Sequence, residues 1–255
     1  MSIIGDIISS LDTEATIQDV RLGIFCTGVL SRNCGLASTM FGGSHQHGHP
    51  AVKEPGSMHG KPALELAQMA HSTDILEAAM GLATINSLLD IDEERCQELN
   101  AGNLIAALGE GKKVAIVGHF PFVQSLKGIV KELWVIERNP TEGDYAESEA
   151  ENLIPQADVV GITSSAITNH SIEQLLALCH PRSYVITLGG TTPLSPVLFD
   201  YGVNAISGTR VINPELALRC ISEGASFRQI QGTHLLTMTS EKTNFKIKQQ
   251  ITRRR

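Results

Sequence analysis

Paired cysteines, long apolar runs and an excess of positive charge are all missing from this sequence. The five cysteines lie far apart with no C-x-x-C pair, which argues against a disulfide framework or a zinc ribbon. No apolar run approaches the roughly 20 residues that a membrane-spanning helix needs. The start, MSIIGDIISSLDTEA, has no basic segment before its apolar residues, so we expect no secretory signal and a cytoplasmic protein. A formal net charge of -7 disfavours general binding to nucleic acids.

The composition indicates a globular protein with a sizeable core. The chain has 255 residues, of which 42% are hydrophobic and 18% charged. We predict two domains, an α+β domain over 1–108 and an α/β domain over 109–255. The first domain should hold a short helix near its start, a hairpin or meander over 17–30, and two helices between 62 and 90. The second of these helices contains Asn86, read either as a core amide or as a ligand contact in a cleft.

The second domain alternates apolar strands with helices. The strand candidates are VAIV, LWVIE, DVVGIT, SYVITL and NAIS, beginning at 114, 133, 158, 183 and 204. Ser171 and Gln174 suggest a capping box at one helix, and Asn213 with Pro214 suggests a cap at another. This alternation predicts a Rossmann-like parallel sheet with helices on both faces. Ligands of such sheets bind beyond the carboxyl ends of the strands.

The first turn of this domain departs from a dinucleotide-binding pattern. Glu137 ends the second strand, where such folds place the acid that holds a ribose hydroxyl. The turn itself reads Gly118-His119-Phe120-Pro121-Phe122 in place of G-x-G-x-x-G. With one glycine and two bulky rings, it would keep a pyrophosphate away from the backbone. We therefore expect something other than ordinary dinucleotide binding.

Glycines and small hydroxyl residues dominate the loops that follow the strands. Backbone N–H groups and short side-chain donors of this kind suit an oxygen-rich or anionic ligand, although the same residue types also form ordinary turns and caps. His119 is a candidate acid, base or metal ligand, or alternatively a structural donor, so the mechanism stays open. The candidate ligand-binding set is Cys34, Asn86, Gly118, His119, Phe120, Glu137, Thr163, Ser164, Asn169, Gly190, Thr191 and Thr192.

A histidine-rich segment forms a separate candidate metal site. In an extended chain His45, His47 and His49 would project to one side, with His59 or Cys34 as a further ligand. Imidazole suits zinc, nickel or copper. The surrounding Gly, Ser and Pro residues are equally typical of a solvated histidine-rich loop with no preorganised surroundings.

Several strings together resemble the bacterial and archaeal family called putative heavy-metal chelation proteins. The resemblance covers nearly the full length and rests on six strings. They are CGLAST from Cys34, the helical string leading to Asn86, VGHFPFV from Val117, VIERNPTEGDY around Glu137, the string around Thr163 and Asn169, and LGGTTPLSPVLFDYGVNAISGTRVINPE with Pro193, Gly208 and Glu215. It implies an enolase-N-terminal-like domain joined to a Rossmann-like domain, with a site in the cleft between them. It also implies a role with a metal chelate or a related small molecule.

These sequence patterns predict one function and leave two alternatives open. We expect a protein that binds a small molecule, such as a chelate of Zn, Ni, Cu or Fe, between its domains, and that binds neither nucleic acid nor membrane. The first alternative is a transferase or oxidoreductase that uses S-adenosylmethionine or NAD. The second is a metal buffer or metallochaperone that works through the histidine-rich segment. Self-association into a homo-oligomer stays open.

Overall fold

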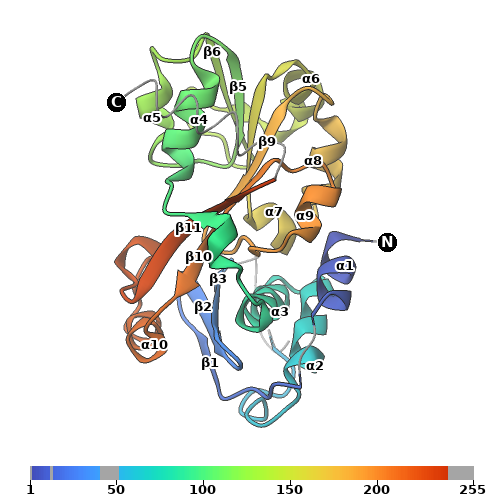
Figure 1. The fold of residues 1–255 in the computed structure, drawn as a ribbon, viewed down its shortest axis with the longest axis vertical. Coiled ribbons are helices and arrows are strands. Elements are labelled where there is room, and N and C mark those ends of the chain that lie inside the picture. The colour runs from blue at the N-terminus through green and yellow to red at the C-terminus, as the bar shows by residue number, and fades with distance from the viewer. Residues whose placement is uncertain (1, 12–13, 41–51, 241–255) are drawn as a thin grey trace.

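The computed structural model describes residues 2–11, 14–40 and 52–240, which form two sheets with their helices (Figure 1). The N-terminal half contains an antiparallel meander in the order β1-β2-β3. Four helical segments accompany it. The elements are α1 (Ile3–Ser9), β1 (Asp19–Leu22), β2 (Cys26–Leu30), β3 (Cys34–Ser38), α2 (Ala63–Ala67), the 3-10 turn η1 (Gln68–His71) and α3 (Ile75–Leu88).

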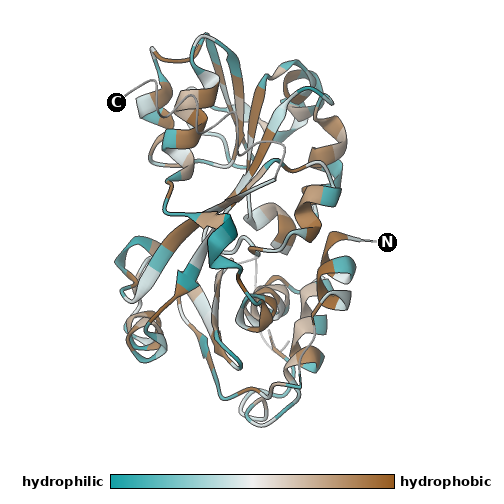
Figure 2. Ribbon diagram, viewed as in Figure 1, coloured by the Kyte–Doolittle hydropathy of each residue, from teal (hydrophilic) through white to brown (hydrophobic). Residues whose placement is uncertain are grey.

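Local sequence accounts for the long helix of this half. Asp74 caps α3 by accepting hydrogen bonds from the N–H groups of Leu76 and Glu77. Nearly all of α3 is buried, as its apolar residues all round the helix require. Hydrophobic residues accordingly run along α3 and along the central strands of the larger sheet (Figure 2).

The C-terminal half is built on an eight-stranded sheet in the order β4-β11-β10-β9-β8-β5-β6-β7. The six strands from β10 to β7 are parallel, and β11 and β4 are antiparallel additions at one edge. The strands are β4 (Cys96–Gln97), β5 (Lys113–Val117), β6 (Glu132–Glu137), β7 (Tyr145–Ala146), β8 (Val159–Thr163), β9 (Tyr184–Leu188), β10 (Ala205–Val211) and β11 (Thr233–Thr239).

Short helices connect these strands, and one of them covers the smaller sheet instead. Helix α10 buries Leu218 and Ile221 in a cluster with Cys26 and Leu36 of the meander. The α-helices are α4 (Ala101–Gly109), α5 (Val123–Leu126), α6 (Ala150–Leu153), α7 (Ser165–Thr168), α8 (Ile172–Leu178), α9 (Val197–Asp200) and α10 (Pro214–Ser222). The 3-10 turns are η2 (Glu93–Arg95), η3 (Glu147–Glu149), η4 (Ile154–Gln156) and η5 (Phe227–Gln229).

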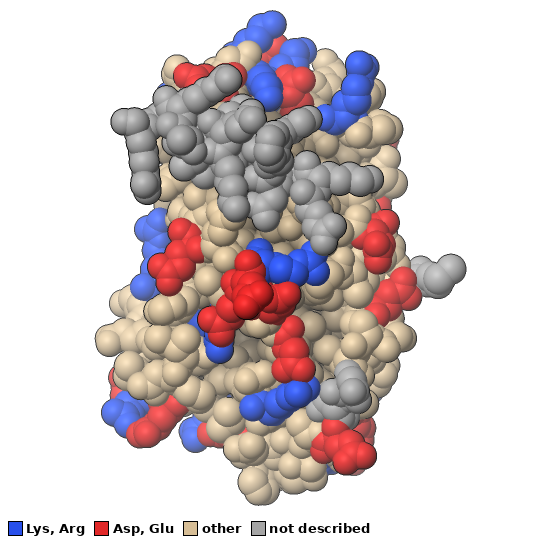
Figure 3. Space-filling view, viewed as in Figure 1, with Lys and Arg blue, Asp and Glu red and all other residues tan. Residues whose placement is uncertain are grey.

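The predicted fold class is confirmed: an α/β sheet of the Rossmann type follows a smaller α+β unit. Numbered along the chain from β5, the parallel strands have the order 3-2-1-4-5-6 of dinucleotide-binding folds. No described helix combines the length and the apolar character needed to cross a membrane. Acidic and basic side chains intermingle over the face shown in Figure 3.

The packing of β4 and α4 indicates that the boundary between the two halves comes before residue 108. Strand β4 already pairs with β11 of the larger sheet. Helix α4 packs Leu104 and Ile105 against Val114 of β5. A cut at 108 would separate both elements from the sheet that they complete, so we propose a boundary between 89 and 96.

Candidate functional site

A cavity of about 270 Å³ lies at the carboxyl ends of β5, β6 and β8. Strands β5 and β8 are adjacent in the sheet although β6 and β7 lie between them in sequence, so the cavity sits where the strand order reverses. Ligands of open α/β sheets bind at this position. The lining residues are Met40, Val117, Gly118, His119, Phe120, Ile136, Glu137, Arg138, Glu147, Ala150, Thr163, Ser165, Ala166, Asn169, Ser171 and Leu175.

Six residues of the predicted ligand-binding set share this cavity. Strand ends that are 20 to 46 residues apart in sequence bring them together, since parallel strands end at one edge of the sheet. Their part in binding stays a prediction. They are Gly118, His119, Phe120, Glu137, Thr163 and Asn169.

The turn after β5 passes close to Thr163 and needs its glycine. Gly118 has a φ of +99°, in the left-handed region. A Cβ at this position would lie 2.9 Å from the Cβ of Thr163. The glycine therefore allows the β5 turn and the β8 turn to form adjacent walls of the cavity.

Glu137 fastens the β5 turn to the end of β6. Its Oε1 accepts a hydrogen bond of 2.6 Å from the N–H of His119, and its Oε2 accepts one of 3.2 Å from the N–H of Arg138. Each carboxylate oxygen still has a lone pair for a further donor. Glu137 thus supports the cavity wall and also presents negative charge to it.

His119 faces a carboxylate that is itself held in place. Nδ1 of His119 lies 3.4 Å from Oδ2 of Asp144, whose side chain is only 5% exposed. Asp144 accepts hydrogen bonds from the N–H and the hydroxyl of Thr141, at 3.1 and 2.7 Å. The Thr141 hydroxyl, aided by its N–H and by nearby His119, holds the pKa of Asp144 below its usual value. With Nδ1 turned to Asp144, Nε2 is the ring nitrogen left for a ligand.

Aromatic rings occupy the region where a dinucleotide fold would place glycines. The rings of Phe120 and Phe122 stack with centroids 5.3 Å apart and 19° between planes. Phe122 also packs on Gly102, where an added Cβ would lie 2.6 Å from the ring. The following helix α5 spans only Val123–Leu126. This turn therefore lacks both the open backbone and the long helix that hold a pyrophosphate in such folds.

Four predicted ligand residues serve packing instead. Ser164 and Thr192 are buried, and the Thr192 hydroxyl has no hydrogen-bond partner among the described residues. Thr191 is buried as well: its hydroxyl accepts a 2.7 Å hydrogen bond from the N–H of Ser38. Gly190 lies under Phe227, since an added Cβ would come within 1.9 Å of that ring.

Asn86 and Cys34 line a different cavity, of about 170 Å³, between the two halves. Asn86 donates through Nδ2 to the carbonyls of Leu36 and Thr191, at 2.8 and 3.0 Å, and so joins the halves. Burial raises the pKa of the Cys34 thiol to about 12. A protonated thiol is a poor metal ligand at neutral pH. Of the twelve residues predicted for one interdomain site, six line the cavity at the strand ends, two line this cavity and four line neither.

The predicted histidine cluster cannot be assembled from the described part of the chain. His45, His47 and His49 lie outside the described residues. Nδ1 of His59 lies 2.9 Å from the carbonyl oxygen of Gln18. Across 2–11, 14–40 and 52–240, no group of three or more His, Cys, Asp or Glu side chains is placed to hold a metal ion.

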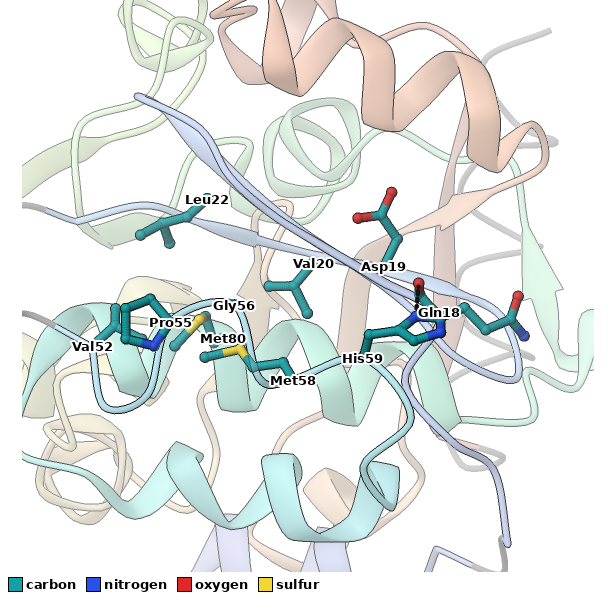
Figure 4. Close-up of a pocket in the computed structure, with 10 residues that line it drawn as sticks. All are labelled: Gln18, Asp19, Val20, Leu22, Val52, Pro55, Gly56, Met58, His59 and Met80. Carbon is teal, nitrogen blue, oxygen red and sulfur yellow. Dashed lines mark hydrogen bonds between the residues drawn. The ribbon is translucent and has the colours of Figure 1, made fainter.

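His59 lines a third cavity, which at about 410 Å³ is larger than the one at the strand ends (Figure 4). Its walls include Val20, Leu22, Met58 and Met80. We nevertheless place the candidate site at the smaller cavity, because that cavity combines several polar side chains with the position where α/β sheets bind ligands.

Several lining residues lie outside the predicted ligand-binding set. Arg138 pairs with Glu147 at 3.1 Å, and the chain between them turns at Gly143 to form β7 beside β6. Asp144 belongs to the same turn. Pro140 and Gly143 mark a turn in the sequence, but nothing in it shows that the turn folds back over the cavity. Met40 reaches the cavity from the end of β3, a contact between the halves that no local pattern reveals.

Comparison with known proteins places this architecture in a family. An uncharacterized protein of Methanocaldococcus jannaschii is 28% identical over 175 residues, covering 66% of this chain and 68% of the relative. Crystal structures of proteins of unknown function from Desulfitobacterium hafniense and Pyrococcus horikoshii have the same fold, with TM-scores of 0.82 and 0.79 and identities of 24% and 23%. Each alignment covers 93% of this chain and 98% of the other. Two family models, both described as putative heavy-metal chelation, match residues 4–89 and 101–239, and the chain belongs to this family.

Proposed function

We propose that this protein binds a small polar molecule in the cavity at the ends of β5, β6 and β8. The proposal rests on one observation: Gly118, Glu137 and Thr163 line the same cavity, at the point where the strand order of the sheet reverses. A volume of about 270 Å³ lies just under the roughly 300–1,000 Å³ typical of ligand pockets. This volume therefore favours a ligand smaller than a dinucleotide.

The lining also indicates which chemical groups the ligand carries. Among the described lining residues, Glu137 and Glu147 contribute two carboxylates, and the one guanidinium, from Arg138, is already paired with Glu147. Thr163, Ser165 and Asn169 add hydroxyl and amide groups. This excess of acceptors favours a ligand with hydroxyl or ammonium donors or with a positive metal centre, and Phe120 offers a flat face.

A preformed metal chelate fits these features better than a bare ion. The family description points to metal chelation. No described cluster of three ligand side chains would hold a free cation. In a chelate the organic ligand satisfies most of the metal coordination, so the protein needs only to recognise the outside of the complex. Metal would then be cargo carried by the ligand.

A nucleoside-containing cofactor such as S-adenosylmethionine or NAD is the second candidate. The strand order 3-2-1-4-5-6 and the place of Glu137 at the end of the second strand favour it. The cavity volume and the Phe120–Phe122 stack weigh against NAD in particular.

Thermal unfolding with a ligand panel distinguishes the two candidates. The panel contains Zn²⁺, Ni²⁺ and Cu²⁺ as free ions and as citrate or histidine chelates, together with adenosine, S-adenosylmethionine and NAD. A ligand at 100 times its Kd stabilises the folded state by about 2.7 kcal/mol. We expect a rise in Tm with a chelate and none with the matching free ion. A rise with a nucleoside alone would support the second candidate.

Substitution then shows whether the effect comes from this cavity. Glu137→Gln removes the charge at the cavity end of β6 and should abolish most of the ligand-induced rise. Glu132→Gln makes the same change at the opposite end of the same strand, 39% exposed, and should leave the rise intact. The proposal fails if no panel member raises the Tm, or if Glu137→Gln and Glu132→Gln respond alike.

A further inference from the structure

The imidazole of His119 stands between a carboxylate and the cavity at the strand ends. Its Nδ1 lies 3.4 Å from Oδ2 of Asp144. His119 lines the cavity, whereas Asp144 is not among the described residues that line it. The ring therefore turns one nitrogen to Asp144 and the other away from it. Among the described residues, none forms a hydrogen bond with Nε2 of His119.

Proteins prepare histidines for metal ions with the same arrangement. A histidine that binds a metal through one ring nitrogen usually donates the N–H of the other nitrogen to a carboxylate, which fixes the tautomer and the orientation of the ring. Asp144 suits this part because the N–H and the hydroxyl of Thr141 hold it in place. The separation of 3.4 Å is slightly longer than a good hydrogen bond, so the ring has to move toward Asp144 on binding.

One imidazole cannot hold a bare ion by itself. Glu137 is the neighbouring acid, since its Oε1 accepts a hydrogen bond of 2.6 Å from the N–H of His119. In the described part of the chain, no group of three or more His, Cys, Asp or Glu side chains is placed to hold a metal ion. Zn²⁺ in proteins has four ligands as a rule. The other ligands therefore have to come from the chelator that carries the metal.

We propose that Nε2 of His119 coordinates the metal of the bound chelate directly and that Asp144 orients the ring for this bond. The inference rests on the proposed function and narrows the ligand to chelates that leave one position of the metal to water. The imidazole takes the place of that water, so a metal–nitrogen bond replaces a metal–oxygen bond and no electron is transferred. With the proton on Nδ1, beside Asp144, the lone pair of Nε2 is free to bind.

Copper bound to iminodiacetate is a suitable probe for this bond. The complex is neutral, which suits a wall that holds Glu137 and Glu147, and the tridentate chelator leaves a position of Cu²⁺ open. Electron spin echo envelope modulation detects the distant nitrogen of a copper-bound imidazole, which iminodiacetate lacks. Because the chain has nine histidines, each measurement is repeated in the background His45→Gln/His47→Gln/His49→Gln.

Three variants locate the bond when the copper complex is kept below the protein concentration. His119→Gln should remove the imidazole modulation. Asp144→Asn keeps the metal ligand, so the modulation should remain while the Kd of the complex rises by about 10- to 100-fold. His234→Gln is the matched control, since Nδ1 of His234 lies 3.5 Å from Oε1 of Glu98 on β11, outside the cavity. It should change neither the modulation nor the Kd.

The direct bond and the proposed function fail in different ways. Unchanged modulation in His119→Gln overturns the direct bond, even where panel ligands raise the Tm and the proposed function stands. A wild-type Kd in Asp144→Asn overturns the orienting role. Both proposals fall if no chelate raises the Tm and no modulation depends on His119. The ligand-free Tm of each variant shows that it is folded, as we expect for His119→Gln because this side chain is 45% exposed.

Discussion

Glu137 keeps the position of a ribose-binding acid but performs another task in the free protein. Its two oxygens accept backbone hydrogen bonds from His119 and Arg138. The same carboxylate therefore shapes the wall that a ligand contacts. Its position could be predicted from the length of the βαβ unit, whereas its bond to His119 depends on how the Phe120–Pro121 turn folds.

Asn86 offers a direct test of how the halves are joined. Asn86→Ala removes the donor to the carbonyls of Leu36 and Thr191. Leaving partly buried acceptors unsatisfied should lower the free energy of unfolding by about 1–3 kcal/mol. Urea unfolding measures the loss. Asn152→Ala, at an exposed position with one long 3.4 Å side-chain bond, serves as the control and should change the free energy by less than about 0.5 kcal/mol. Equal losses would refute the bridging role.

The turn beside the cavity should respond to acid through Asp144. Because hydrogen bonds from Thr141 lower the pKa of Asp144 in the folded state, its contribution is fully present above the unfolded pKa of about 3.9 and is lost as the pH falls through the lower folded pKa. The Tm advantage of the wild type over Asp144→Asn should therefore be larger at pH 5 than at pH 3 and should shrink as the pH falls below about 4.

Thr141→Val tests whether the Thr141 hydroxyl causes this pH dependence while Asp144 itself stays in place. The variant keeps the carboxylate but removes the hydroxyl that bonds it at 2.7 Å. Its Tm should depend less steeply on pH in the acid range than that of the wild type. Identical acid profiles for the two proteins would mean that Thr141 does not set the pKa of Asp144.

The candidate residues show which parts of the site could be predicted from a single sequence. Six of the twelve ligand-binding candidates meet in one cavity, because strand-end positions follow from the strand pattern. Thr191 and Gly190 follow a strand as well, but they pack against Ser38 and Phe227. Those partners come from distant parts of the chain, so no local pattern separates a binding threonine from a packing one.

Helix α3 is fixed in place by the glycines at its contacts. A Cβ on Gly81 would lie 1.9 Å from the backbone nitrogen of Ala70 in η1. Likewise, a Cβ on Gly35 of β3 would lie 2.1 Å from the carbonyl oxygen of Ala83. The backbones of η1 and β3 therefore lie very close to α3, which explains why glycine occupies positions 81 and 35.

Gly81→Ala tests that contact against helix propensity. Alanine favours a helix over glycine by about 1 kcal/mol, but here its methyl group would overlap backbone atoms that cannot rotate away. We expect a net loss of about 2 kcal/mol or more in urea unfolding. Gly5→Ala in α1 is the matched comparison, because the nearest atom to its added Cβ is the side-chain oxygen of Ser2, at 3.1 Å. A gain in stability for Gly81→Ala would contradict the packing.

Strong apolar patterns in the sequence predicted five strands of the larger sheet. The three strands that were not predicted form through pairing with distant segments of the chain. The five strand candidates of the second domain became β5, β6, β8, β9 and β10. Strands β4 and β7 have two residues each, and β11 exists because it pairs with β10 along its whole length. The predicted capping box at Ser171 was wrong: Ser171 makes no side-chain cap and its hydroxyl donates to Asn169 at 2.6 Å.

One hydrophobic core runs through both halves of the molecule. It joins Ile7 of α1 and Ile85 of α3 to Ile162 of β8 and Leu198 of α9. Polar contacts reinforce the junction, since Asp6 accepts a 2.5 Å hydrogen bond from Tyr201. The two domains predicted from sequence therefore describe the topology of the chain, whereas their shared core indicates one folding unit.

The shared core predicts a single cooperative unfolding transition. Ile7→Ala removes a fully buried side chain from the N-terminal half and should cost about 2–5 kcal/mol, which lowers the Tm by about 4–20 °C for a protein of this size. Trp134 is the only tryptophan and lies in β6 of the other half. Its fluorescence should therefore report the same lowered Tm as far-UV circular dichroism, with equal calorimetric and van't Hoff enthalpies. If the Trp134 transition stayed at the wild-type temperature while the circular dichroism signal split into two steps, the halves would fold independently despite their common core.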